Sequence, residues 1–173
     1  MKRQRTRGQR PTRTRIALAA AVAVAAAATV TVGVAQAGDD RRGKAGERQI
    51  AALFDQWNAA LQSGDPAKVA ERYAEDAVLL PTASPQIRTN RAEITDYFEH
   101  FLQKKPRGEK IRSVINVLDK DSALDAGVYR FHLTDLKTGV TKAVEARYTY
   151  EYEKRNGKWL IVNHHSSVLP AEG

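Results

Sequence analysis

Four long segments with the residue pattern of β-strands follow one another in the C-terminal part of the chain, and they constrain its fold most. They cover residues 111–118, 124–133, 140–153 and 159–169. Short polar segments separate them, at 119–121, 135–139 and 156–157. Connections this short join neighbouring antiparallel strands. The sequence therefore predicts an antiparallel meander of four strands.

Two helices are expected in the segment that begins at Glu47. Apolar residues recur there at helical spacing from Ile50 to Leu61, and Ser63-Gly64 ends the first helix. Asp65-Pro66 is typical of an N-cap followed by the first helical residue. A second helix is therefore predicted from this point to about Ala74, followed by a short strand over 78–80.

A third helix is predicted after Asn90, because Glu93 three residues later resembles a capping box. Its apolar face includes Tyr97 and Phe101, and Lys105-Pro106 ends it. A sheet formed by one chain must cover one face, and these three helices can do so. The fold class is therefore α+β: three N-terminal helices packed on a curved, mainly antiparallel sheet, with a cone-shaped pocket between the layers.

The N-terminus has the organisation of a secretory signal peptide. Residues 1–37 contain seven basic residues and no acidic one, and 16–34 is uncharged and rich in alanine and valine. The segment closes on Ala35-Gln36-Ala37, small residues at the two positions that signal peptidase reads. We expect cleavage after Ala37 and secretion by the Sec route. The alternative is a retained N-terminal membrane anchor, since the uncharged run is about long enough to span a bilayer.

The distribution of charge excludes nucleic acid as a partner. The formal net charge is +8, but residues 38–173 hold 21 basic against 20 acidic residues. A nearly neutral body has no electrostatic attraction to phosphate backbones. The expected organisation is a signal peptide at 1–37, a flexible glycine-rich linker at 38–46 and one domain at 47–170, with no membrane contact after cleavage.

Three stretches resemble a known superfamily. They are Asp55-Gln56-Trp57 through Ser63-Gly64-Asp65, the helix from Asp96 to Leu102, and Arg155-Asn156-Gly157-Lys158-Trp159 through His164-His165-Ser166-Ser167. The chain resembles the nuclear transport factor 2-like, or SnoaL-like, superfamily. Within it, the chain is most similar to the association (hub) domain of calcium/calmodulin-dependent protein kinase II and its bacterial relatives, the SgcJ/EcaC group.

This resemblance implies the fold more strongly than an activity, because the superfamily hosts isomerases, cyclases and pure assembly modules. It also implies a homodimer or higher homo-oligomer, formed through the convex side of the sheet. The two arginines that line the hub cavity correspond to Tyr150 and Ser166, so a more neutral, aromatic pocket is expected here. The chain lacks the glycine-rich loop, lysine and H-R-D motifs of a kinase. No nucleotide-binding glycine motif follows any strand, and we expect no cofactor.

Strand alternation divides the last hairpin into two faces. One face carries Tyr148, Tyr150, Tyr152, Leu160, Val162, His164 and Ser166. His164 is the predicted acid or base, because imidazole exchanges protons near neutral pH, with Tyr150 or Ser166 as hydrogen-bond donor. A core histidine with satisfied hydrogen bonds is the alternative. Trp57, Tyr73, Tyr97 and Phe101 are expected to roof this pocket from the helices.

The other face carries Arg147 roughly across from His165. This cross-strand pair is a second candidate ligand-binding feature for an anionic group, extended by Arg130 and His132, or else an interface contact. His164 and His165 point to opposite sides of a strand, so no metal site is expected.

Two functions follow from these observations. The first is an exported protein that binds a small organic molecule of unknown identity in the cone-shaped pocket. It could also be a proton-transfer enzyme of the isomerase or cyclase kind. The alternative is a non-catalytic, hub-like association module.

Overall fold

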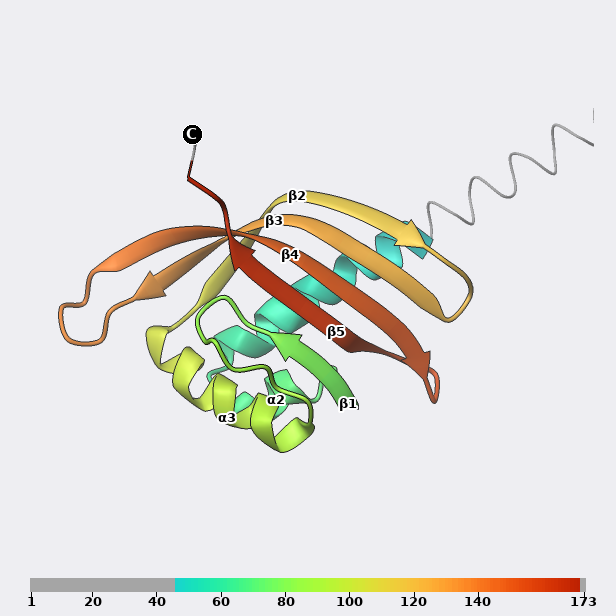
Figure 1. Ribbon diagram of the computed structural model, residues 1–173, viewed down its shortest axis with the longest axis horizontal. Coiled ribbons are helices and arrows are strands. Elements are labelled where there is room, and N and C mark those ends of the chain that lie inside the picture. The colour runs from blue at the N-terminus through green and yellow to red at the C-terminus, as the bar shows by residue number, and fades with distance from the viewer. Residues whose placement is uncertain (1–45, 172–173) are drawn as a thin grey trace, which may run out of the picture. The chain divides into compact units, whose positions relative to one another are not determined.

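The computed structural model describes residues 46–171, and the fold is given for these residues. The expected signal peptide, its cleavage site and the linker up to residue 45 lie outside them. Three helices and a short 3-10 helix lie against one face of a five-stranded sheet (Figure 1). The α+β class, with helices on a mainly antiparallel sheet, is confirmed. None of the helices within these residues has the length and apolar character needed to cross a membrane.

The first described helix covers residues 46–62 and already includes Gly46, which the sequence pattern assigns to the linker. Its buried face is formed by Ile50, Phe54, Trp57 and Leu61, as the helical spacing predicts. The helix ends at the Ser63-Gly64 turn, where Gly64 has a φ of 71°. A glycine adopts this left-handed conformation without steric cost, which explains why the helix stops there.

Helix α2 is shorter than predicted. It spans Pro66–Ala70, and the Asp65 carboxylate caps it by accepting from the backbone N–H of Ala67 at 3.0 Å. The prediction that it continues to about Ala74 is wrong, because strand β1 (Tyr73–Leu80) begins there. β1 lies at the edge of the sheet and pairs in parallel with the C-terminal strand. This pairing between distant segments is invisible to local periodicity.

Helix α3 (Arg91–Phe101) begins as the capping box predicts, and the 3-10 helix η1 (Leu102–Lys104) extends it. The Asn90 side chain accepts from the N–H of Glu93 at 3.0 Å. The Glu93 carboxylate accepts from the N–H of Thr89 at 2.8 Å, one residue before the usual capping-box partner. Both ends of the motif are therefore satisfied, and the buried side of the helix faces the sheet.

The predicted meander of four strands is confirmed. Its strands are β2 (Arg107–Val117), β3 (Ser122–Thr134), β4 (Thr141–Arg155) and β5 (Lys158–Val168). The order across the sheet is β1-β5-β4-β3-β2, with antiparallel pairing throughout the meander. The helices and the core lie on one side, which we call the concave face (Figure 1). The opposite, convex face has no described helix on it.

A β-bulge in the last hairpin changes one part of the predicted face. Tyr150 pairs with His164, but the register shifts so that Tyr152 pairs with Ile161 and Val162 is the extra residue. Ile161 is therefore buried on the concave face, with 2% of its surface exposed. The prediction that Leu160 and Val162 share the tyrosine face fails at the bulge, and both are only half-buried.

Candidate functional site

A cavity of about 250 Å³ lies between the concave face of the sheet and helix α3. Most of its lining is apolar or aromatic. The lining comes from the first helix, the loop after β1, α3 and three strands: Trp57, Pro81, Thr82, Ala83, Tyr97, Phe98, Phe101, Tyr129, Phe131, Leu133, Val144, Ala146, His164 and Ser166. Its volume equals that of roughly eight water molecules in the liquid, enough for an aromatic ring with a short substituent.

The structure brings most of the predicted pocket residues together. Trp57, Tyr97, Phe101, His164 and Ser166 all line the cavity. Tyr73 belongs to strand β1 rather than to a helix. Like Tyr150, it is fully buried beside the ring of His164 and does not line the cavity.

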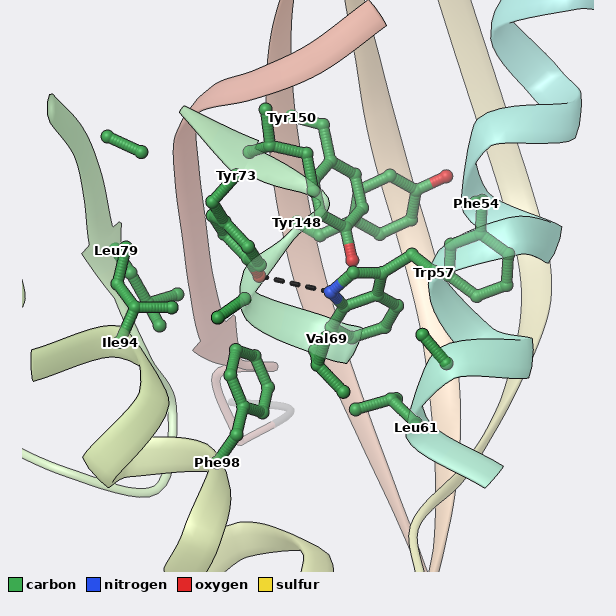
Figure 2. Close-up of a cluster of buried hydrophobic side chains, with 14 of the residues drawn as sticks. Phe54, Trp57, Leu61, Val69, Tyr73, Leu79, Ile94, Phe98, Tyr148 and Tyr150 are labelled. Carbon is green, nitrogen blue, oxygen red and sulfur yellow. Dashed lines mark hydrogen bonds between the residues drawn. The ribbon is translucent and has the colours of Figure 1, made fainter. Parts of the chain in front are cut away.

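A buried hydrogen-bond chain fixes the His164 ring. The indole N–H of Trp57 donates to the hydroxyl of Tyr73 at 3.1 Å, and this hydroxyl lies 2.8 Å from Nδ1 of His164. Figure 2 shows the first of these bonds within the aromatic core. An indole can only donate, so the tyrosine oxygen accepts from it and its own proton is available to Nδ1. The reverse arrangement would leave the Tyr73 proton without an acceptor among the described residues, and on this ground we assign the proton of neutral His164 to Nε2.

His164 is neutral at ordinary pH. It is 3% exposed, and its Nε2 atom has no hydrogen-bond partner among the described residues. Burial, and to a smaller extent the neighbouring His165, lowers the pKa of His164 from 6.5 to about 3. A ring with this pKa holds almost no charge at pH 7 and is a weak base. His164 therefore lines the cavity as a neutral ring whose buried Nε2 atom has unused hydrogen-bonding capacity.

Tyr150 supports His164 by stacking rather than by hydrogen bonding. The two ring centroids are 4.2 Å apart, with an angle of 30° between the planes. The Tyr150 hydroxyl is buried without a partner, and burial raises its pKa well above 10. Tyr150 is therefore placed to hold the imidazole ring in position. This stacking contact does not make Tyr150 a hydrogen-bond donor to a ligand.

A second polar group lies at Ser166. The hydroxyl of Tyr129 donates to Ser166 Oγ at 2.5 Å, and Ser166 also hydrogen-bonds to the hydroxyl of Thr82. Thr82 comes from the loop after β1, so this contact joins the loop to β3 and β5. These three hydroxyl groups and His164 are polar groups of residues that line a mostly apolar cavity.

Arg147 and His165 do not line the cavity, which corrects their assignment as pocket residues. Both are exposed, and they are offset rather than opposite, because Arg147 pairs with Ser167 and His165 with Thr149. Arg147 lies on the convex face and pairs in register with Val128 of β3.

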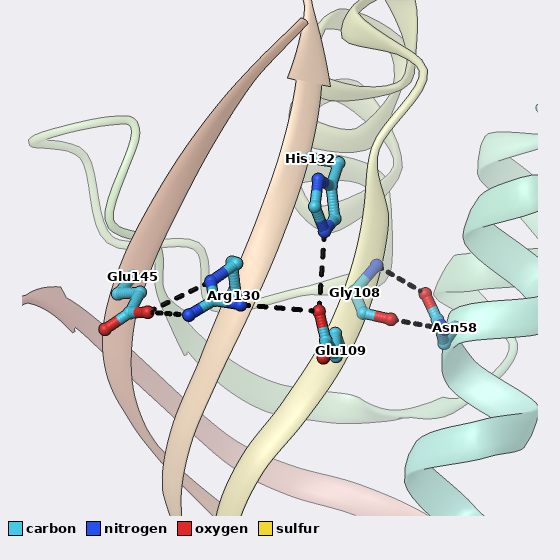
Figure 3. A network of polar contacts seen from close by, with 6 residues as sticks. All are labelled: Asn58, Gly108, Glu109, Arg130, His132 and Glu145. Carbon is cyan, nitrogen blue, oxygen red and sulfur yellow. Dashed lines mark hydrogen bonds and ion pairs between the residues drawn. The ribbon is translucent and has the colours of Figure 1, made fainter.

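The predicted extension of this patch is occupied by ion pairs. Arg130 pairs with Glu145 at 2.5 Å and with Glu109 at 3.8 Å, and His132 lies 3.5 Å from the same Glu109 carboxylate (Figure 3). These side chains also belong to the convex face, since Arg130 pairs in register with Glu109 and Glu145. Two carboxylates pair with Arg130, and His132 lies beside one of them, so this cluster presents no unpaired arginine to an anion.

Asp125 is the strand carboxylate on the concave face. It is fully buried and accepts from the hydroxyl groups of Ser113, at 2.6 Å, and Tyr148, at 3.0 Å. It does not line the cavity. Within the described part of the chain, no strand carboxylate therefore lines the cavity, where a general base for a bound ligand would be needed. Among residues 46–171 there is also no group of three or more side chains able to hold a metal ion.

Sequence reasoning missed several lining residues. Tyr129, Phe131 and Leu133 alternate along β3, and this alternation could have assigned them to the tyrosine face. Pro81, Thr82 and Ala83 belong to a loop that no periodicity describes. Their place at the cavity follows from the tertiary contact between Thr82 and Ser166.

The comparisons agree with this architecture. A crystal structure of a nuclear transport factor 2-like protein from Pseudomonas putida is 20% identical, covers 72% of this chain and 87% of its own, and has a TM-score of 0.61. The association domain of the Caenorhabditis elegans kinase is 16% identical, covers 73% and 98%, and has a TM-score of 0.62. At these identities the likeness shows the fold alone. The fold is nuclear transport factor 2-like.

Two further comparisons identify the family to which the chain belongs. The model of the calcium/calmodulin-dependent protein kinase II association domain matches residues 46–170. A crystal structure described as such a domain, from Xanthomonas campestris, is 58% identical, covers 72% of this chain and 89% of its own, and has a TM-score of 0.71. The chain belongs to this association-domain family. A search of curated proteins found no match.

Proposed function

We propose that the protein binds a small, largely apolar molecule that carries a hydrogen-bond acceptor, such as a carbonyl group. The observation that carries this proposal is His164: a buried, neutral imidazole that lines an apolar cavity and whose Nε2, itself buried, has no hydrogen-bond partner among the described residues. A buried donor without a partner costs about 1–3 kcal/mol, and a ligand acceptor would remove that cost. The low pKa of His164 favours this binding role over proton transfer at neutral pH.

Acetophenone is a suitable probe, because it combines one aromatic ring with one carbonyl oxygen. We expect a dissociation constant on the order of 1 mM, as is usual for a ligand with so few atoms. In ¹⁵N-edited NMR, the imidazole Nε2 signal of His164 should shift on titration. His164→Gln should weaken binding about tenfold. His165→Gln, the neighbouring change on the opposite face, should leave it unchanged.

Two results would contradict this proposal. One is the absence of acetophenone binding to the folded wild-type protein. The other is equal weakening by His164→Gln and His165→Gln, which would place the ligand outside the cavity.

A second candidate function is homo-oligomeric association. Family membership supports it, because association-domain homologues suggest oligomerisation. The convex face also supports association, because its apolar residues Val114, Leu124 and Val128 are only partly buried within one chain. Light scattering on the purified protein measures the native mass. A mass of two or more chains supports association, and a monomer at micromolar concentration argues against it.

We also infer that the protein is exported and that signal peptidase cleaves after Ala37. The inference rests on the basic, apolar and Ala35-Gln36-Ala37 segments in that order. Expression with a C-terminal tag in a bacterial host, followed by mass spectrometry, tests it. The mature chain should begin at Gly38. An intact N-terminus in the membrane fraction would instead support the retained anchor.

A further inference from the structure

A second hollow adjoins the apolar cavity. The two share Ala83, Tyr97 and Phe101 as lining residues, so they are neighbouring parts of one depression. The second hollow has a volume of about 340 Å³ and is more polar. Its other lining residues are Ser84, Arg88, Asp96, His100 and Lys104.

Arg88 is held firmly at this place. Its backbone N–H and C=O form a two-way bridge with Leu79 of β1, at 2.9 and 2.8 Å. Its guanidinium donates from Nη1 to the carbonyl of Gln86 at 3.0 Å, and the guanidinium carbon lies 5.8 Å from the centroid of the Tyr97 ring. Tyr97 lines both hollows, so Arg88 sits directly beside the apolar cavity.

Arg88 forms no ion pair within residues 46–171. The side chain is 7% exposed, its Nε atom has no hydrogen bond, and no described carboxylate lies within 4 Å of it. The arginines at 91, 130 and 155, by contrast, all pair with carboxylates.

The acidic side chains nearest to this hollow have other contacts. Glu93 accepts from the backbone N–H and the hydroxyl of Thr89; the charge of Arg88 contributes only a smaller part of the lowering of the Glu93 pKa, and the two form no ion pair. Asp96 is exposed. Lys104, also exposed, adds a second positive charge. Burying an unpaired charge is costly, and a bound carboxylate would remove much of that cost through a charge-assisted, bidentate contact.

We propose that the cavity and the second hollow form one site for an organic carboxylate, whose apolar body fills the cavity and whose carboxylate pairs with Arg88. This inference rests on the proposed function and names the chemical class of its ligand. Lys104 lies where it would add electrostatic attraction at the solvent side. The class fits the volumes: an apolar body of about one aromatic ring next to one anionic group.

The test compares 3-phenylpropanoate with 3-phenylpropanamide, two ligands of the same shape that differ in charge. Isothermal titration at pH 7 should show the carboxylate binding at least tenfold more tightly to the wild-type protein. In Arg88→Gln this preference should fall below twofold, while the amide binds as in wild type. Arg88→Lys should keep a preference of about threefold. Arg112→Gln, which removes an exposed charge elsewhere, should keep the full preference.

The outcomes separate this inference from the proposed function. If both ligands bind wild type equally, or if the preference survives in Arg88→Gln, the role of Arg88 is overturned while a small-molecule site remains. If neither ligand binds to the folded wild-type protein, both proposals fail. Unchanged amide binding in Arg88→Gln shows that the variant is folded and its cavity intact. Loss of amide binding as well would mean that Arg88 supports the structure rather than an anion.

Discussion

His164 differs from an ordinary surface histidine through its surroundings alone. Its neighbours are the Tyr73 hydroxyl at Nδ1, the Tyr150 ring stacked at 4.2 Å and the cavity. Burial among these groups keeps the ring uncharged, and its Nε2 atom has no hydrogen-bond partner among the described residues. The same burial that defines the candidate site also makes this residue sensitive to acid.

We expect His164 to destabilise the fold as the pH falls below about 6.5. In the unfolded chain the imidazole takes up a proton near its ordinary pKa of 6.5, whereas in the folded protein it does so only near pH 3. The unfolded state therefore binds more protons between these values, and stability decreases as pH decreases. Between pH 6.5 and 5 this loss amounts to about 1.5 kcal/mol.

Denaturant unfolding at pH 6.5 and pH 5 measures this contribution. The difference should be smaller by about that amount in His164→Gln, which cannot titrate. His165→Gln should retain the wild-type difference. Equal pH dependence in wild type and His164→Gln would contradict the burial of a neutral imidazole.

Tyr73→Phe should remove the centre of the buried hydrogen-bond chain. The change leaves the indole N–H of Trp57 and Nδ1 of His164 without their partner, at a cost of about 2–4 kcal/mol in unfolding free energy. It should also shift His164 toward the other tautomer, visible in the ¹⁵N chemical shifts of the ring. A variant with wild-type stability and an unchanged tautomer would show that this chain does not orient His164.

At the scale of elements, Asn58 connects the first helix to the sheet. Its amide donates to the carbonyl of Gly108 at 2.9 Å and accepts from the N–H of the same residue at 2.8 Å (Figure 3). Both backbone groups would otherwise need water or another partner. Because Gly108 lies near the start of β2, this contact fixes where that strand meets the helix.

Asn58→Ala should therefore destabilise the protein by about 2–3 kcal/mol, since two buried backbone groups lose their partner. The matched control is Gln62→Ala in the same helix, whose exposed amide only donates to a helical carbonyl. That control should change stability by less than about 0.5 kcal/mol. Chemical denaturation of both variants compares them, and equal stability would exclude a structural role for the Asn58 contact.

Gly127 is required by the bulge between β2 and β3. The register shifts between Lys110 and Arg112, and a Cβ atom at Gly127 would lie 1.9 Å from the carbonyl oxygen of Arg112. Gly127→Ala should cost at least about 2 kcal/mol, because backbone rather than a flexible side chain would have to move. Thermal unfolding should show no such effect in Ala126→Ser. A Gly127→Ala protein of wild-type stability would contradict the close approach.

At the scale of the whole molecule, the two sheet faces have different roles. The concave face packs against the helices and encloses the cavity, whereas the convex face carries Val114, Leu124 and Val128 only partly covered. Val128 pairs in register with Arg112 and Arg147, so its surroundings on this face are basic.

If chains associate through the convex face, Val128→Glu should lower the native mass to that of a monomer. The introduced carboxylate would be compatible with the folded monomer, because two arginines flank it, but not with an apolar contact between chains. Val140→Glu, an exposed change in the loop between β3 and β4, is the control and should not alter the mass. An unchanged mass in both variants would exclude the convex face as the interface.

The sequence was sufficient where the signal is local. Helical spacing predicted the helix that the structure shows at 46–62, and Asn90 with Glu93 predicted the start of α3. The positions of the turns predicted the four-stranded meander. Strand alternation also put Tyr150, His164 and Ser166 on one face. These features depend on residues close together in the chain, so pattern and turn chemistry determine them.

Only the tertiary structure decided the rest. Tyr73, predicted in a helix, lies in strand β1, which is formed by parallel pairing with β5. Ile161 is buried in the core because the bulge at Val162 shifts the register of the last hairpin. Within the described residues, the lack of a partner at Nε2 of His164 and at Nε of Arg88 likewise depends on which segments far apart in sequence surround them. Burial and pairing of charges depend on which distant segments meet, and no local pattern contains that information.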